Sequence, residues 1–410
     1  MKITLLCHVM PYPPIHGGRV DQWRRIKALS TLGAELQLIT WVSDTPKQEE
    51  IAEIEKYVKK MNIIPFKSTP SAVIRRLLDL FRYPLEVTSR IVRGKEFTSL
   101  LSDVRVFNPD VIFLDGLHGG LVAAKLSDCL KVPMIARSHN IEHLYYRRLV
   151  ASATGLNKIK RYLSLSNLEN YEKKVLKKSA FFYDISADDL KFWQRQGFMN
   201  GRYLPPIVEF PKDNQLENTS SQESENKVYD IVFLGNLNLE NNVAGITWFI
   251  NQVFPVIRST LPNVTVLIAG SNPVHKVSEL CEDQEGVRLS PNPASAVEVY
   301  KSGKVLINPV LTGSGVSIKS IEMMVYGKPI VSTPQGIAGL PEDVNKYFHI
   351  ANDAPSFAAE IIQCLSEPQK ADVDRELLES LFGYQVLEGV LSDIKLLSGK
   401  YSVSQSYEVQ

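Results

Sequence analysis

Short apolar runs alternate with helical patterns along almost the whole chain, and this alternation constrains the fold more than any other feature. In the first half the runs are KITLLCHVM, ELQLITWV, VIFLDG, PMIARSHN and FFYDIS. In the second half they are YDIVFLGNL, NVTVLIAGS, GVRLSP, KVLINPV and KPIVST. Runs this apolar, separated by helices, are typical of parallel strands that are covered on both faces. The sequence therefore predicts an α/β protein with two consecutive doubly wound sheets.

A polar stretch, PKDNQLENTSSQESENK, separates the two arrays. Its composition is that of a linker or an exposed loop. With 410 residues, the chain is also too long for a single ordinary core. We expect a first domain at 1–210, the linker at 211–227, a second domain at 228–375, and a C-terminal amphipathic helix with its tail at 376–410.

The cysteines and the N-terminus bear on the cellular compartment. Cys7, Cys129, Cys281 and Cys364 lie far apart and form no Cys-x-x-Cys pair, which fits reduced thiols better than disulfides or a zinc site. The N-terminal apolar run is interrupted by prolines and is interpreted as a β-strand, not as a signal peptide. No uninterrupted apolar run of about 18 residues occurs, so no membrane-spanning helix is expected. These features favour a cytoplasmic protein.

Charge is distributed unevenly between the two halves. Residues 1–210 hold 32 Lys and Arg against 21 Asp and Glu, whereas residues 211–410 hold 14 against 24. The net charges of +11 and −10 give the overall +1 and suggest different partners for the halves. Two stretches, 55–97 and 143–178, carry most of the basic excess. They favour peripheral docking to anionic lipid at the inner face of a membrane, or they are solvated helix faces; nucleic acid fits less well because no recognition motif accompanies the charge.

Ligands of doubly wound sheets bind outside the carboxyl ends of the strands, and one such loop carries a distinctive pattern. The stretch TGSGVSIKSIEMMVYGKPIVST begins at residue 312 and follows the run KVLINPV. Gly313 and Gly315 allow a tight turn and a close approach to a ligand. Lys319 adds a positive charge near the start of the expected helix, and Glu322 follows three residues later. The pattern is either a phosphate cradle beside a sugar site or an ordinary loop followed by a helical Lys–Glu pair.

The longer segment GSGVSIKSIEMMVYGKPIVSTPQGIAGL resembles the donor-site signature of retaining GT-B glycosyltransferases that use nucleotide sugars. The stretches RSHNIEHLYYRRL and PYPPIHGGRVDQWRR resemble bacterial members that build exopolysaccharides. The resemblance covers nearly the whole chain. It implies a GT-B fold, in which two Rossmann-like domains face a central cleft and a C-terminal helix follows the second domain.

The resemblance also implies roles for individual residues. Lys319 would contact the donor diphosphate, and Glu322 would accept hydrogen bonds from the ribose hydroxyls. Gly17 and Gly18 would approach the diphosphate from the first domain. The remaining donor-site positions are Asn236, Gly313, Ser314, Gly315, Val316 and Ser317.

The chain departs from the family pattern at two places. Ser314 stands where many relatives have an acid that touches the donor hexose. Asn236, followed by Asn241 and Asn242, occupies the region where many relatives have an Arg and a Lys. Both departures leave the identity of the donor open, and Arg19 or Arg137 could supply the missing charge.

His139 follows the run PMIARS and, by the resemblance, lies near the transferred sugar as a catalytic residue together with Lys319 and Glu322. A neutral imidazole can hydrogen-bond a hexose hydroxyl and stabilise charge in a transition state. Alternatively, His139 caps a helix, or it pairs with His143 as a metal ligand. His16, His118 and Glu142 are weaker candidates for acceptor contacts.

No metal is expected, because the sole Asp-x-Asp, Asp372 to Asp374, lies in the C-terminal helical region and not after a strand. We expect no cofactor beyond the donor itself, a UDP- or GDP-sugar. The function implied is transfer of a hexose to a hydroxyl of a glycan, glycolipid or glycoprotein, with retention of configuration. A nucleotide-sugar epimerase of the same fold and a non-catalytic partner subunit remain alternatives at this point.

Overall fold

The computed structural model describes residues 1–15, 17–211, 228–313, 315–367 and 373–407. His16, Ser314 and nearly all of the expected linker at 211–227 lie outside these ranges. The chain forms two compact units. Unit 1 comprises Met1–Ile207 and Tyr384–Gln410, and unit 2 comprises Val208–Gly383.

Unit 1 contains a seven-stranded sheet in the order β3-β2-β1-β4-β5-β6-β7, and all of its pairings are parallel. The strands are β1 (Lys2–Cys7), β2 (Glu35–Val42), β3 (Lys60–Pro65), β4 (Val111–Asp115), β5 (Met134–Ser138), β6 (Phe181–Asp184) and β7 (Gly201–Tyr203). Its helices are α1 (Gly17–Thr31), α2 (Gln48–Glu55), α3 (Pro70–Asp79), α4 (Leu85–Thr88), α5 (Gly94–Phe107), η1 (Leu117–Gly119), α6 (Gly120–Leu130), α7 (Glu142–Ser152), α8 (Gly155–Leu165), α9 (Leu168–Lys178), α10 (Ala187–Arg195) and α20 (Val386–Tyr407).

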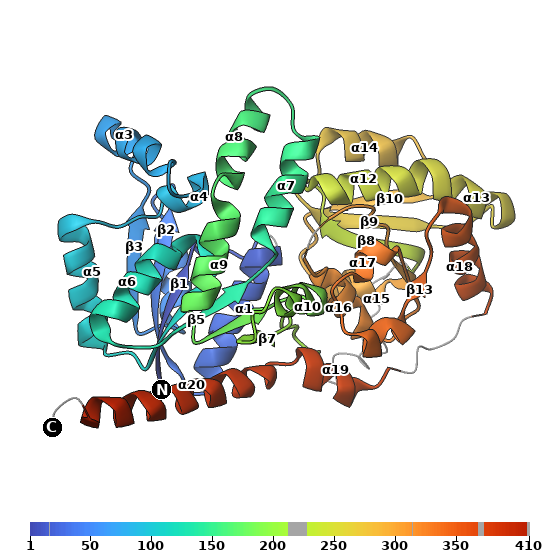
Figure 1. Ribbon diagram of the computed structural model, residues 1–410. Coiled ribbons are helices and arrows are strands. Elements are labelled where there is room, and N and C mark those ends of the chain that lie inside the picture. The colour runs from blue at the N-terminus through green and yellow to red at the C-terminus, as the bar shows by residue number, and fades with distance from the viewer. Residues whose placement is uncertain (16, 212–227, 314, 368–372, 408–410) are drawn as a thin grey trace. The chain divides into compact units, whose positions relative to one another are not determined.

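Both faces of the first sheet are buried, as the continuous apolar strands predict. Successive strand residues point to opposite faces. Leu6 and Leu114 therefore join a core with α5, α6 and α9, while Leu5 and Phe113 join a second core with α1 and α20. Figure 1 shows helices on both faces of this sheet.

The C-terminal helix α20 belongs to unit 1, although it follows unit 2 in sequence. Its Leu387, Val390 and Ile394 are buried in the same core as β1. Asp393 accepts a hydrogen bond of 2.7 Å from the Tyr183 hydroxyl and forms an ion pair with Arg202. The sequence predicts one C-terminal helix with its tail at 376–410, whereas the described part of this range holds α20 and most of a second helix, α19 (Arg375–Phe382), which packs into unit 2.

Unit 2 contains a six-stranded parallel sheet in the order β10-β9-β8-β11-β12-β13. The strands are β8 (Tyr229–Asn236), β9 (Val266–Ser271), β10 (Val287–Pro291), β11 (Gly303–Asn308), β12 (Ile330–Ser332) and β13 (His349–Ile350). Its other helices are α12 (Glu240–Trp248), η2 (Phe249–Val253), α13 (Phe254–Thr260), α14 (His275–Glu282), α15 (Ala296–Lys301), α16 (Ile318–Met324), α17 (Pro334–Ile337), η3 (Glu342–Tyr347) and α18 (Ala354–Ser366).

The two units share one strand order. With strands numbered from its own start, the sheet of unit 2 reads 3-2-1-4-5-6, and that of unit 1 reads the same with a seventh strand at the end. In such sheets the strand order reverses between the first and fourth strands, and ligands bind at this switch point. The switch points lie between β1 and β4 in unit 1 and between β8 and β11 in unit 2. The predicted fold class, α/β with two doubly wound sheets, is confirmed.

Glycine allows the elements around the second switch point to approach closely. A Cβ atom on Gly270 would lie 1.7 Å from the carbonyl oxygen of Gly235, and one on Gly245 would lie 2.4 Å from that of Pro309. Gly245 therefore lets α12 pack directly against the loop that follows β11. Within the described ranges, no helix has both the length and the apolar character needed to cross a membrane.

Candidate functional site

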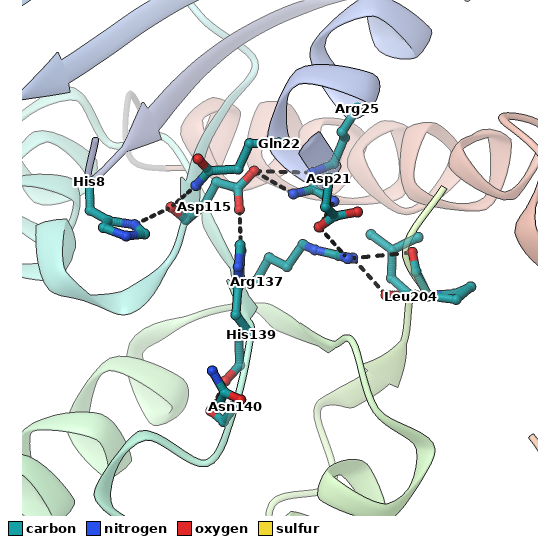
Figure 2. A network of polar contacts seen from close by, with 11 residues as sticks. His8, Asp21, Gln22, Arg25, Asp115, Arg137, His139, Asn140 and Leu204 are labelled. Atoms are coloured by element: carbon teal, nitrogen blue, oxygen red, sulfur yellow. Dashed lines mark hydrogen bonds and ion pairs between the residues drawn. The ribbon is translucent and has the colours of Figure 1, made fainter. Parts of the chain in front are cut away.

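Asp115 is the centre of a buried polar network at the switch point of unit 1 (Figure 2). It is the last residue of β4, and only 1% of its side chain is exposed. Arg25 donates to its Oδ2 from Nε at 3.0 Å and from the terminal guanidinium nitrogen at 2.7 Å. His139 Nε2 lies 2.7 Å from its other oxygen, Oδ1. The carboxylate therefore joins a helix residue of α1 to the histidine that follows β5.

The same network continues to a second carboxylate. Asp21 accepts from Arg25 at 3.0 Å and from Arg137 at 2.9 Å, and Arg137 also donates to the carbonyl of Leu204 at 2.6 Å. Two guanidinium groups thus balance two carboxylates that are removed from water. Arg137 is fully buried and held by these contacts. It is therefore occupied within unit 1, which contradicts the idea that it replaces a missing charge at the diphosphate.

The charge of Asp115 fixes which nitrogen of His139 carries a proton. Burial alone would raise the pKa of Asp115, but the Arg25 guanidinium and the hydrogen bond from His139 outweigh burial and hold that pKa well below its usual range. An ionised carboxylate only accepts hydrogen bonds. Nε2 of His139 must therefore be the donor, and in the neutral ring Nδ1 carries the lone pair.

Two further histidines lie at the same edge of the sheet. His8 follows β1 and His118 lies in η1; their ring centroids are 5.0 Å apart, and those of His8 and His139 are 6.4 Å apart. Burial, then Arg90 and the neighbouring His139 ring, lowers the pKa of His8 to about 3. Burial, followed by His8 and Arg90, also holds the pKa of His118 well below its usual value. Both rings are neutral at pH 7, and the buried ring nitrogens of His118 have no hydrogen-bond partner among the described residues.

Glu142 and His143, at the start of α7, are organised by another carboxylate. Glu172 of α9 accepts from the backbone N–H of Glu142 at 2.8 Å and from His143 Nδ1 at 2.6 Å. His139 and His143 thus contact different carboxylates, and no cluster of three or more metal-ligating side chains occurs within the described ranges. The alternative of a shared metal is therefore not supported. Burial, then Glu172, raises the pKa of Glu142 to about 8, so its carboxyl group is protonated at pH 7.

Gly17 and Gly18 open α1 and are exposed. One turn later the same helix carries Asp21 and then Arg25, so the buried network anchors the helix whose first residues were predicted to meet a diphosphate. The acceptor candidate His16 lies outside the described residues.

In unit 2, the side chain of Lys319 in α16 contacts only uncharged groups among the described residues. Its Nζ donates to Asn242 Oδ1 at 2.8 Å and lies 4.4 Å from the centroid of the Phe233 ring. Burial lowers the pKa of Lys319 to about 7. Cation–π contact and an amide oxygen stabilise the ammonium only partly, so its charge is not neutralised by these partners.

Asn236 at the end of β8 and Asn242 in the first turn of α12 lie beside Lys319. Asn242 donates from Nδ2 to the carbonyl of Asn236 at 2.9 Å, and Asn236 Oδ1 accepts from the backbone of Asn238 at 3.0 Å. Gly313 lies close to the neighbouring Asn241, since a Cβ on Gly313 would be 3.7 Å from Asn241 Nδ2. The structure thus brings Asn236, Gly313 and Lys319 together at the switch point of unit 2.

The turn before α16 directs its side chains inward. Gly315 has a φ of 71°, which favours glycine. Val316 packs against the core, and the Ser317 hydroxyl accepts a hydrogen bond of 3.1 Å from Asn308 Nδ2. Ser314 lies outside the described residues.

Glu322 follows Lys319 by one helical turn and contacts the buried Tyr300. The Tyr300 hydroxyl donates to Glu322 Oε2 at 3.3 Å. Tyr300 is 2% exposed and fixed in the core, so it orients the carboxylate. The pair Lys319 and Glu322 therefore presents a cation and an oriented acceptor from one helix.

Sequence reasoning missed Asp21, Arg25 and Asp115 in unit 1, and it misinterpreted Asn242 in unit 2. Asp115 carries a signal that could have been used, because an acid ends the otherwise apolar run VIFLD at the expected switch point. Asn242 was interpreted as the loss of a basic residue, whereas it binds the retained Lys319.

Comparison with known proteins gives one match to unit 2 and others to nearly the whole chain. Residues 228–367, which lie in unit 2, match the family model described as Glycosyl transferases group 1. Among curated proteins, the chain is 26% identical over 374 residues to an uncharacterized 44.6 kDa protein in the cps region of Klebsiella pneumoniae. The alignment covers 88% of this chain and 90% of that protein.

Several solved structures are similar to this chain over nearly its whole length. Anabaena HepE in complex with UDP and glucose has a TM-score of 0.61 at 12% identity and covers 96% of this chain and 99% of its own. A glycosyltransferase from Rickettsia africae gives 0.64 at 14% identity, with 97% and 98% covered. WaaG, a glycosyltransferase involved in lipopolysaccharide biosynthesis, gives 0.59 at 12% identity, with 96% and 99% covered. At these identities the likeness shows the fold, which is that of the GT-B glycosyltransferases.

Proposed function

We propose that the protein is a retaining glycosyltransferase that moves a hexose from a nucleotide diphosphate sugar to an acceptor hydroxyl. One observation carries the proposal: the partly buried Lys319 contacts Asn242 and Phe233 but no carboxylate among the described residues, and it lies inside the segment that matches a glycosyltransferase family. A partly desolvated amine beside uncharged groups is suited to bind an anion.

On the donor side, Lys319 binds the diphosphate and Glu322 accepts from the ribose diol. Gly313, Gly315 and the backbone of Val316 and Ser317 lie beside the phosphates. A bound diphosphate raises the pKa of Lys319 from its value of about 7, because an adjacent negative charge favours the protonated amine. Donor binding is therefore coupled to proton uptake.

On the sugar side, His139 supports the hexose from unit 1. Asp115 holds Nε2, so Nδ1 is available to accept a hydrogen bond from a sugar hydroxyl. In the transfer step, the bond from the anomeric carbon to the diphosphate breaks while the acceptor oxygen bonds to the same face of that carbon. The acceptor proton passes to the leaving phosphate oxygen, and Lys319 stabilises the charge on the diphosphate.

A UDP-sugar donor and a surface-polysaccharide or lipid-linked acceptor fit the relatives best. HepE is described in complexes with UDP and with glucose, WaaG acts in lipopolysaccharide biosynthesis, and the Klebsiella relative lies in a cps region. A GDP-sugar remains the second candidate donor. We propose no metal requirement, since Lys319 and backbone amides would take over the leaving group.

The stereochemical course can be followed without knowing the acceptor, because water can replace the acceptor and hydrolyse the donor slowly in such enzymes. The purified protein is incubated with UDP-glucose or GDP-mannose, with and without EDTA, and followed by proton NMR. Release of UDP or GDP with the first-formed hexose in the donor's own anomeric configuration supports the proposal. The opposite anomer contradicts retention, and an epimerised nucleotide sugar contradicts transfer. Thermal shifts with UDP, GDP, ADP and TDP then identify the base.

A further inference from the structure

Helix α3 has its apolar side toward solvent. Val73, Ile74, Leu77 and Leu78 recur at helical spacing and are all exposed, as is Phe81 just beyond the helix, at 84%. None of the residues of α3 is buried. An amphipathic helix on a globular protein normally turns this stripe toward the core. The orientation of α3 is therefore the reverse of the usual one.

Polar contacts hold α3 in this orientation. Arg93, at the start of α5, binds both oxygens of Asp79, at 2.8 and 2.7 Å. Arg76 donates to the carbonyl of Lys67 at 2.8 Å, and Thr69 caps the helix. Because the polar side of the helix faces unit 1, the apolar stripe is left for another partner.

Helix α8 adds a second exposed stripe at the same end of unit 1. Leu156 is 84% exposed, and Ile159 and Tyr162 follow on the same side of the helix. The opposite side contacts the protein through Ser164, which donates to Glu86 at 3.3 Å. Asn167, just after α8, donates to the carbonyls of Leu80 and Phe81 at 3.4 Å each, so the two helices are linked. Figure 1 shows α3 and α8 projecting from this end of unit 1.

Positive charge surrounds both stripes. Arg75, Arg76 and Arg82 accompany α3, whose only acid, Asp79, is paired with Arg93. Residues 143–168, which include α8, hold five Lys and Arg and no Asp or Glu. The patch formed by α3, Phe81 and α8, here the α3–α8 surface, thus combines exposed apolar side chains with a basic rim.

We infer that the α3–α8 surface docks on an anionic lipid bilayer, with the two apolar stripes inserted among the lipids and the basic rim at the headgroups. A bilayer supplies both an apolar interior and negative charge, which is the complement of this surface. A second copy of the chain would instead bring two basic rims together. The inference stands on the surface alone and does not depend on glycosyl transfer.

Cosedimentation of the full-length protein with vesicles tests the inference. We expect binding to vesicles of phosphatidylcholine with phosphatidylglycerol, weaker binding to phosphatidylcholine alone, and a decrease with added salt. The variant Ile74→Ser/Leu78→Ser/Phe81→Ser should bind anionic vesicles about ten-fold or more weakly, because it removes inserted apolar area. The variant Lys158→Glu/Lys160→Glu should lose the preference for anionic lipid.

A matched control replaces exposed apolar residues of unit 1 outside this surface. Val106 and Met199 are 78% and 81% exposed, so Val106→Ser/Met199→Ser should bind vesicles as the parent protein does. Circular dichroism confirms that each variant is folded. Equal vesicle binding by the triple serine variant and the parent would overturn the inference. So would a dimer in size-exclusion chromatography that the triple variant dissociates, in a protein that does not bind vesicles.

Discussion

The two switch points share one topology, but the charged side chains at them are paired differently. In unit 1, Asp21, Arg25, Asp115 and Arg137 neutralise one another in the interior. In unit 2, Lys319 contacts an amide and an aromatic ring but no carboxylate within the described part of the chain. Paired buried charges fix a structure, and losing one partner leaves the other uncompensated. A lysine with no carboxylate partner among the described residues is instead available to a ligand. From this difference we propose a positioning role for the network of unit 1 and a binding role for Lys319.

Removing Arg25 should give the largest effect. Arg25→Met leaves Asp115 and Asp21 with fewer compensating charges in the interior, so we expect a loss of about 3–5 kcal/mol in the free energy of unfolding. Urea denaturation followed by circular dichroism measures it. Arg105→Met, at an exposed position on α5, is the control and should change stability by less than about 0.5 kcal/mol. Equal stability of the two variants would mean that the network of unit 1 is not structural.

Replacing His139 should lower turnover while nucleotide affinity is kept. For His139→Ala we expect kcat to fall about 100- to 1000-fold, because a group that stabilises the reacting sugar is lost, and the Kd for UDP or GDP to stay within about two-fold. Single-turnover kinetics and calorimetry separate the two quantities. Asp115→Asn should lower kcat in the same direction through the orientation of the ring. An unchanged rate in His139→Ala would remove this residue from the catalytic set.

Replacing Lys319 should weaken nucleotide binding without lowering stability, whereas replacing Arg25 should lower stability. For Lys319→Met we expect about 10- to 100-fold weaker nucleotide binding, the value of a hydrogen bond to a charged group. Stability at pH 7 should stay equal or rise, since burial disfavours the charged amine and that penalty disappears. Lys276→Met removes an exposed lysine of the same unit and should leave both quantities unchanged. A stability loss as large as that of Arg25→Met would abolish the contrast between the units.

Glu322 should contribute less to nucleotide affinity than Lys319. Glu322→Ala removes the acceptor that Tyr300 orients, so we expect about ten-fold weaker binding of the nucleotide. The same variant should lose little affinity for the 2′,3′-dideoxy nucleotide, which lacks the ribose hydroxyls. Calorimetry with both nucleotides makes the comparison, and wild-type affinity for the ribonucleotide would rule out the ribose contact.

Local patterns in the sequence were enough for most of the fold. The long apolar strands could be recognised, whereas β3 (KMNIIP), β7 (GRY) and β13 (HI) were missed. β3 is interrupted by polar residues and only half buried at the sheet edge, and the other two are too short to show a period. The position of α20 was also out of reach, because its apolar face does not indicate which unit it covers.

In the candidate site, too, residues close in sequence could be predicted, whereas contacts between distant residues could not. Gly313 to Glu322 are neighbours in sequence, so their spacing could be read directly. The partner of His139 lies 24 positions away, and that of Lys319 lies 77 positions away. Such pairs are created by the sheet order, which brings strand ends together, and no local pattern reports them.

The proton balance of donor binding tests the central claim most directly, because it asks whether the unpaired cation receives the anion. Calorimetry of UDP or GDP binding at pH 8, in two buffers of different ionisation enthalpy, gives the number of protons taken up. With the pKa of free Lys319 at about 7 and a much higher value beside a diphosphate, the protein should take up about 0.9 proton per nucleotide bound. Lys319→Met should take up none. Nucleotide binding with no proton uptake in the parent protein, or with the same uptake in both proteins, would contradict the account.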